Sequence, residues 1–127
     1  MTGTRTASST VPDPRPSVVG RGRTARVLGA RCSSCGRPSA FAVPRCPACR
    51  AVVSPEAFGP GGTVWSVTTI RIPVPGRTPP YSLAYIDLDD GPRVLAHVGG
   101  GGPVGIGGRV QLVGLGAEGD IEVEPSE

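Results

Sequence analysis

Alternating apolar and β-branched residues in the second half of the chain predict five β-strands. The longest covers residues 63–72, is dense in valine, threonine and isoleucine, and follows a pair of glycines. A proline-rich loop ends it, because proline cannot donate a hydrogen bond to a β-ladder. The same pattern predicts four further strands, at residues 81–88, 93–98, 109–115 and 120–123.

Turn residues between these strands indicate how they pair. Asp89, Asp90, Gly91 and Pro92 form a tight-turn sequence, so we expect the flanking strands to form an antiparallel hairpin. Five strands within residues 59–124 suit a small closed or partly open β-barrel. A domain of this size buries only about 60% of the surface of its unfolded chain. We therefore expect a metal ion or a partner protein to add stability.

Composition divides the chain into three parts. Residues 1–28 are rich in arginine, serine and proline without hydrophobic periodicity, which predicts a flexible tail in preference to an organelle transit peptide. Residues 29–58 contain all four cysteines, and residues 59–124 contain the predicted strands. Glycine (20) and proline (15) together make 35 of 127 residues, which excludes a helical bundle because both residues destabilise helix interiors.

The sequence predicts neither a membrane span nor a secretory signal. No apolar run approaches the roughly 18 residues that a transmembrane helix needs, and residues 1–28 lack the apolar centre of a signal peptide. We therefore expect a protein without membrane contact in the reducing cytoplasm, where clustered cysteines usually bind metal.

The net charge of +3 conceals opposite charges on the two halves. Residues 1–50 carry nine arginines and one acid, a charge of +8, whereas residues 51–127 carry four arginines and nine acids, a charge of −5. A polyanion should therefore approach the first half and be repelled by the second.

The cysteines form two C-x2-C pairs, Cys32 with Cys35 and Cys46 with Cys49. A C-x2-C turn directs two thiolates at one point, and Gly36 suits the left-handed position that follows such a turn. Two turns supply the four sulfurs of a tetrahedral Zn²⁺ site with no open position, which indicates a structural ion.

Two other interpretations of these cysteines remain. Two disulfide bonds would need an oxidising compartment. An Fe(Cys)4 centre has the same sulfur geometry as zinc, so spacing cannot separate the two ions. Rubredoxin, which carries such an iron centre, packs several aromatic residues around it, whereas only Phe41 lies between these cysteine pairs. We therefore favour zinc over iron.

No set of residues in the sequence assembles a catalytic site. The glycine-rich segment 98–108 lacks the Lys-Ser/Thr ending of a phosphate-binding loop, so it is interpreted as a connector. His97, the single histidine, lies in a predicted strand with no nucleophile at a telling spacing. Asp87, Asp89 and Asp90 could form an acidic metal site, but hairpin-turn chemistry explains them equally well.

The order of these motifs resembles the DUF35 family, in which a rubredoxin-like zinc ribbon precedes an OB-fold. The resemblance covers roughly residues 28–115. It rests on Cys32-Ser33-Ser34-Cys35-Gly36, Pro44-Arg45-Cys46-Pro47-x-Cys49, Gly59-x-Gly61, Val64-x-Ser66-x-Thr68, Pro80-Tyr81, Ala84-x-Ile86-x-Leu88, Gly91-Pro92-Arg93-Val94-Leu95 and Ile106-Gly107-x-x-Val110. It implies a mainly β fold, with a zinc ribbon at 29–58 and a five-stranded OB-fold at 59–124.

The resemblance also implies a function. DUF35 proteins act beside thiolases, lipid-transfer-type aldolases and related acyl-CoA enzymes. We therefore expect a non-catalytic accessory subunit that docks on such an enzyme and supports its acyl-CoA site. Guanidinium groups suit phosphate oxygens, so the arginines near the ribbon are weak candidates for contacts with CoA. They are Arg31, Arg37, Arg45 and Arg50.

Two other functions fit parts of the sequence. Zinc ribbons and OB-folds bind nucleic acids in other proteins, but a groove for single strands needs positive charge as well as stacking aromatics. The second half is negative and offers only Trp65, Tyr81 and Tyr85 for stacking, so nucleic-acid binding ranks second. An electron-transfer rubredoxin with an appended barrel would need iron and ranks third.

Overall fold

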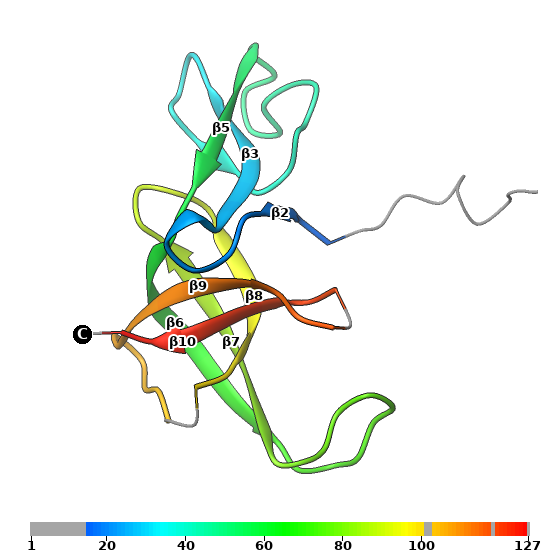
Figure 1. Ribbon diagram of the computed structural model, residues 1–127. Coiled ribbons are helices and arrows are strands. Elements are labelled where there is room, and N and C mark those ends of the chain that lie inside the picture. The colour runs from blue at the N-terminus through cyan, green and yellow to red at the C-terminus, as the bar shows by residue number, and fades with distance from the viewer. Residues whose placement is uncertain (1–14, 101–102, 118, 127) are drawn as a thin grey trace, which may run out of the picture.

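The computed structural model describes residues 15–100, 103–117 and 119–126. In Figure 1 a small sheet around the cysteines lies above a five-stranded barrel. Residues 1–14 of the predicted flexible tail lie outside the described residues, as do residues 101 and 102 of the predicted glycine-rich connector. Within the described ranges, no helix is long and apolar enough to cross a membrane.

Five strands close the barrel. They are β6 (Gly61–Ile70), β7 (Tyr81–Leu88), β8 (Arg93–Val98), β9 (Arg109–Leu115) and β10 (Ile121–Pro125). Their order around the barrel is β10-β8-β7-β6-β9, and β9 pairs with β10 to complete the circle. β8 and β10 run parallel, and the other neighbours run antiparallel. A closed five-stranded barrel of this kind is an OB-fold, so the expected fold is confirmed.

Alternation along the strands fills the barrel. Ala84, Ile86 and Leu88 of β7 point inward and are at most 3% exposed. They join one apolar cluster with Val110 and Leu112 of β9. The predicted hairpin is also present, because β7 and β8 pair antiparallel on either side of the aspartate-containing turn.

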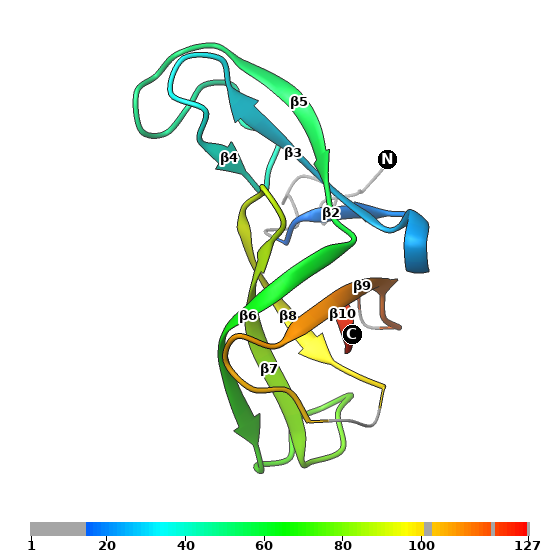
Figure 2. The same ribbon diagram turned by 90° about the vertical axis from the view of Figure 1, so that its left-hand side faces the viewer.

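The cysteine-containing sheet is built on β3 (Arg26–Cys32). β2 (Ser17–Val19) and β4 (Pro38–Ser39) pair with successive parts of β3, and β5 (Val53–Phe58) pairs antiparallel along most of its length. A single 3-10 turn, η2 (Gly22–Thr24), connects β2 to β3. Figure 2 shows this sheet extending away from the barrel, with β2 and η2 at the end nearer the barrel.

The start of this sheet differs from the sequence prediction. Residues 17–28, which we expected to belong to a flexible tail, contain β2 and the beginning of β3. A three-residue strand is too short to produce a visible alternation, and Val27 is buried because it packs into the core cluster once β3 pairs with β2 and β5. Long-range pairing therefore orders a segment whose own sequence carries no strand signal.

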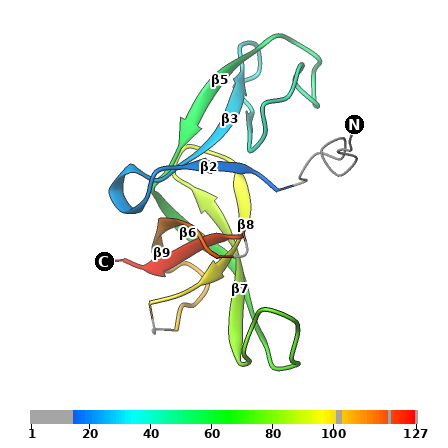
Figure 3. The same cartoon turned by 45° about the vertical axis from the view of Figure 1, so that its right-hand side comes forward.

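The two sheets share one hydrophobic core. Ala25, Val27 and Phe58 belong to the cluster that fills the barrel. β5 ends at Phe58 and β6 begins at Gly61, so the cysteine-containing sheet continues almost directly into the barrel. Figure 3 shows the loop between β6 and β7 at the opposite end of the barrel from that sheet. The end of the barrel where β6 begins therefore adjoins the cysteine-containing sheet, and the β6–β7 loop lies at the other end.

Candidate metal centre and adjoining groove

The four cysteines lie in two tight turns with the same backbone geometry. The Gly36 N–H donates to the Cys32 carbonyl at 3.1 Å, and the Arg50 N–H donates to the Cys46 carbonyl at 2.8 Å. Gly36 and Arg50 are each four residues after the first cysteine of their pair, and both have positive φ, 79° and 67°. Each turn brings its two thiols to one point, as the spacing predicts.

The sulfur atoms have the separations of a tetrahedral metal site. Cys32 Sγ lies 3.4 Å from Cys49 Sγ, and Cys35 Sγ lies 3.8 Å from Cys46 Sγ. All four lie within 4.8 Å of one another. Four sulfurs at about 2.3 Å from one ion are about 3.8 Å apart, whereas a disulfide bond is about 2.05 Å long. The cysteines are free, and their arrangement fits one metal ion.

Backbone hydrogen bonds favour the thiolate form that a metal requires. The N–H groups of Ser34 and Cys35 each donate to Cys32 Sγ at 3.3 Å. The bond from Cys35 is the main cause that lowers the pKa of Cys32 to about 6. The Cys49 N–H lowers the pKa of Cys46 in the same way. The first cysteine of each pair therefore loses its proton more easily, and the thiolate is the form that binds a cation.

Burial divides the centre into an inner and an outer half. Cys32 and Cys46 are buried, whereas Cys35 and Cys49 are exposed. Because the chain itself supplies four sulfurs, a bound ion would have a complete coordination sphere. The arrangement suits a structural ion that links the two turns.

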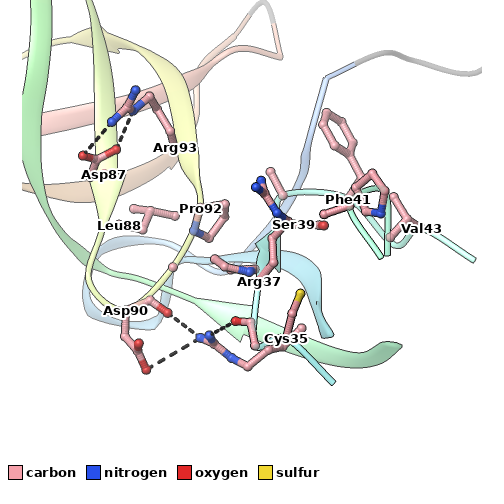
Figure 4. A pocket seen from close by; sticks show the side chains of 17 residues that line it. Cys35, Arg37, Ser39, Phe41, Val43, Asp87, Leu88, Asp90, Pro92 and Arg93 are labelled. Carbon is pink, nitrogen blue, oxygen red and sulfur yellow. Dashed lines mark hydrogen bonds and ion pairs between the residues drawn. The ribbon is translucent and has the colours of Figure 1, made fainter. Parts of the chain in front are cut away.

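A groove of about 1160 Å³ lies between the first cysteine turn, residues 38–48 and the β7–β8 hairpin (Figure 4). Phe41, Val43, Leu88 and Pro92 give it apolar walls, and Arg37 adds a positive side chain. The groove is open to solvent along the surface between the cysteine-containing sheet and the barrel.

Arg31 holds the two sides of this region together. Its guanidinium donates two hydrogen bonds of 3.0 Å to the Glu56 carboxylate and another to the Asp90 carbonyl. It also donates to the Gly36 carbonyl and lies over the Phe58 ring, 5.5 Å from the centroid. Arg31 therefore links the cysteine turn, β5 and the β7–β8 turn. Sequence spacing could not show these partners, because they lie 25 and 59 residues away.

The other three candidate arginines are exposed. Arg37 lines the groove, whereas Arg45 and Arg50 are not among its lining residues. Within the described part of the chain, none of these three side chains has a hydrogen-bond or ion-pair partner. The structure thus brings Arg31 and Arg37 to the groove and leaves Arg45 and Arg50 outside it.

The three aspartates near the hairpin turn do not form a common site. Asp87 pairs with Arg93, Asp89 with Arg109, and Asp90 with Arg31. Each carboxylate is thus bound by a different arginine. The cysteines are the one group of potential metal ligands found among the described residues.

His97 is a part of a local polar cluster. Its Nε2 lies 3.3 Å from Asp120, and its ring stacks on Tyr81 with centroids 5.7 Å apart. Burial lowers the pKa of His97, and the positive charge of Arg77 acts in the same direction. The side chain is 15% exposed, so His97 is a partly exposed residue of β8.

Comparison with known proteins assigns the barrel. Residues 56–115 match the family model described as ChsH2, C-terminal OB-fold domain. This range begins within β5 and ends with β9. No curated protein matches the chain.

Two solved structures share the fold. One is described as the Ltp2-ChsH2(DUF35) aldolase; it is 24% identical, with 79% of this chain and 84% of that chain covered and a TM-score of 0.63. The other is a DUF35 protein of unknown function from Sulfolobus solfataricus, 21% identical, with 80% of this chain and 76% of that chain covered and a TM-score of 0.63. The likeness to both includes most of the chain.

Proposed function

We propose, since the chain belongs to the DUF35 family, that it is an accessory subunit which docks on a thiolase- or aldolase-like acyl-CoA enzyme. In this proposal it supports the acyl-CoA site of that enzyme and performs no chemistry itself. The observation that carries the proposal is the two-part fold shared with a DUF35 protein described as part of an aldolase. A protein with this role would be cytoplasmic.

We propose zinc as the ion held by Cys32, Cys35, Cys46 and Cys49. Zinc bound by four thiolates supplies no reactive position, so its contribution is to stabilise the turns beside the groove. Elemental analysis of the purified protein should give one zinc per chain and a colourless solution. One iron per chain with a red colour would contradict the assignment.

The groove supports a direct contact with CoA. Arg37 is exposed and has no partner among the described residues, so its guanidinium is available for a phosphate. Phe41 lies in the same groove and is 44% exposed. Arg31 has a different role in this proposal, because Glu56 and Asp90 occupy its donors.

Co-expression with a thiolase- or aldolase-like subunit from the same genome tests the docking. We expect the two chains to co-purify in a fixed ratio by size-exclusion chromatography with light scattering. A Cys46→Ser variant, which removes a buried ligand, should weaken the ribbon and reduce co-purification. Failure of the wild-type chain to associate with any such subunit would contradict the proposed function.

A further inference from the structure

The aromatic residues of this chain are distributed unevenly. The sequence contains five, and Phe58 is the one in the core, where it is 3% exposed. The other four gather on one outer surface of the molecule. Phe41, Trp65 and Tyr85 are 44%, 51% and 45% exposed there. A chain with 4% aromatic residues thus places most of them where they do not stabilise its own core.

Strand register brings this surface together. Tyr85 of β7 pairs with Leu95 of β8, which is 48% exposed. Trp65 lies where a bulge shifts the register of β6, and its ring meets that of Tyr85 edge to face with centroids 6.2 Å apart. Tyr81 stacks on His97 at the other end of β7. We call Phe41, Trp65, Tyr81, Tyr85 and Leu95 the aromatic face.

A pocket of about 300 Å³ opens next to the aromatic face. Phe41 and Leu95 line it together with Leu83, and Ile121 adds apolar wall from β10. Its polar lining residues are His97, Asp120 and two arginines that are paired with carboxylates, Arg15 with Asp120 and Arg93 with Asp87. Its volume is about ten times the ~30 Å³ share of a water molecule, enough for one large side chain. An apolar surface with such a pocket resembles the anchor site of a protein interface.

The charges around the aromatic face do not suit a polyanion. Arg93 lies over the Trp65 ring, 3.8 Å from its centroid, and the Asp87 carboxylate binds it at 2.6 and 3.2 Å. Arg77 faces Glu122 at 3.4 Å. These two arginines are therefore neutralised, and one face of the tryptophan is covered. Single-stranded nucleic acid needs free positive charge and open stacking faces.

We propose that the aromatic face is the surface on which the partner subunit docks. This inference rests on the proposed function and adds the place of contact. The matching surface of the partner is apolar and poor in charge, because the centre of the face is apolar and the arginines beside Trp65 and His97, Arg93 and Arg77, are already paired with carboxylates. One bulky apolar side chain of the partner occupies the pocket. Paired charges then form the polar rim that protein interfaces show.

Binding of the co-expressed thiolase- or aldolase-like subunit to surface variants tests this proposal. Leu95→Glu and Tyr85→Ala change exposed side chains of the aromatic face, so the fold should survive, as thermal unfolding would verify. Val52→Glu is the matched control, because Val52 is 59% exposed and precedes β5 at the end of its sheet away from the barrel (Figure 1). We expect Leu95→Glu to raise the Kd at least about 30-fold, as a central interface residue does. Val52→Glu should bind like the wild type.

The outcomes separate this proposal from the proposed function. If the wild-type chain binds the subunit and both face variants bind equally well, the docking surface is wrong while the function stands. If the wild-type chain does not bind, both fail. Two further results would reassign the face: a dimer of the isolated chain that Leu95→Glu converts to a monomer, or submicromolar binding of oligothymidine that quenches Trp65, the single tryptophan.

Discussion

At the scale of the residue, the two cysteine turns have the same backbone but unequal sequences. Gly36 adopts its positive φ without a Cβ, whereas Arg50 adopts the equivalent conformation with one. The left-handed region costs a residue with a Cβ roughly 1–2 kcal/mol. The sequence predicts the first position from its glycine and gives no signal for the second.

Arg50→Gly should therefore stabilise the protein by about 1 kcal/mol, because it removes the strain of the left-handed arginine. Urea unfolding of the metal-loaded protein measures this change. Gly36→Ala introduces the same strain at the matching position and should destabilise by a similar amount. A loss of stability in Arg50→Gly would show that the arginine side chain contributes more than its backbone costs.

The opposite charges of the two halves of the chain partly neutralise each other in the folded protein. Arg31 of the positive half binds Glu56 and Asp90 of the negative half. The Asp89 carboxylate binds Arg109 at 2.7 and 2.8 Å. The pairing of opposite charges across the fold follows from the register of the strands, which charge counting cannot supply. The pKa of Asp89 is lowered mainly by its hydrogen bonds with Arg109.

Because folding lowers the pKa of Asp89, this pair stabilises the protein above the usual pKa of 3.8 and is lost as the pH falls below it. Asp89→Asn should cost roughly 0.2–1 kcal/mol at pH 7, the range for exposed ion pairs, and progressively less as the pH falls below 3.8. Urea unfolding at several pH values measures the difference. Asp90→Asn, with a carboxylate 94% exposed, should change stability less. A cost for Asp89→Asn that is the same at pH 3 as at pH 7 would contradict the account.

At the scale of the element, β7, β8 and β9 have the bounds predicted from alternation. β6 begins and ends two residues earlier than predicted, and its earlier start follows from the pairing of Gly61 and Gly62 with β9. A Cβ on Gly62 would lie 2.7 Å from the Ile86 side chain, so the strand needs glycine there. β10 extends beyond its predicted end, to Pro125, because β9 pairs with it that far.

The elements around the cysteines were the least predictable. β2, β4 and β5 have no clear alternation of apolar and polar residues. Pro55 lies inside β5, although a proline normally argues against a strand. β5 pairs with β3, so only one of its edges must supply hydrogen bonds. The cysteine cluster was predictable because the spacing within each pair is local. The aromatic face was not predicted from the sequence. The signal for it was that β7 carries apolar residues on its outward as well as its inward face.

The junction between the two sheets depends on close packing at Gly91. A Cβ at this position would lie 2.8 Å from Cδ1 of Phe58, which is 3% exposed. Gly91→Ala should therefore destabilise the protein by about 1–3 kcal/mol, the usual cost of overpacking a core. Gly105→Ala is the control, since nothing lies within 4 Å of its Cβ position. Equal unfolding midpoints for the two variants would show that the junction tolerates the methyl group.

At the scale of the whole molecule, the cysteine-containing sheet and the barrel act as one body. They share a single hydrophobic cluster, and Arg31 connects them on the surface. The groove and the aromatic face meet at Phe41, which borders both cavities. A partner on the aromatic face would therefore lie close to a ligand in the groove. This proximity is how an accessory subunit would support the acyl-CoA site of its partner.

Reconstitution of acyl-CoA turnover is the most direct measurement of this role. The thiolase- or aldolase-like subunit would be assayed alone, with the zinc-loaded chain, and with the Leu95→Glu variant, beside the chain without any partner. The account predicts no turnover by the isolated chain and a higher rate for the subunit when the wild-type chain is added. Thioester turnover by the isolated chain, or a partner rate that the chain does not change, would contradict it.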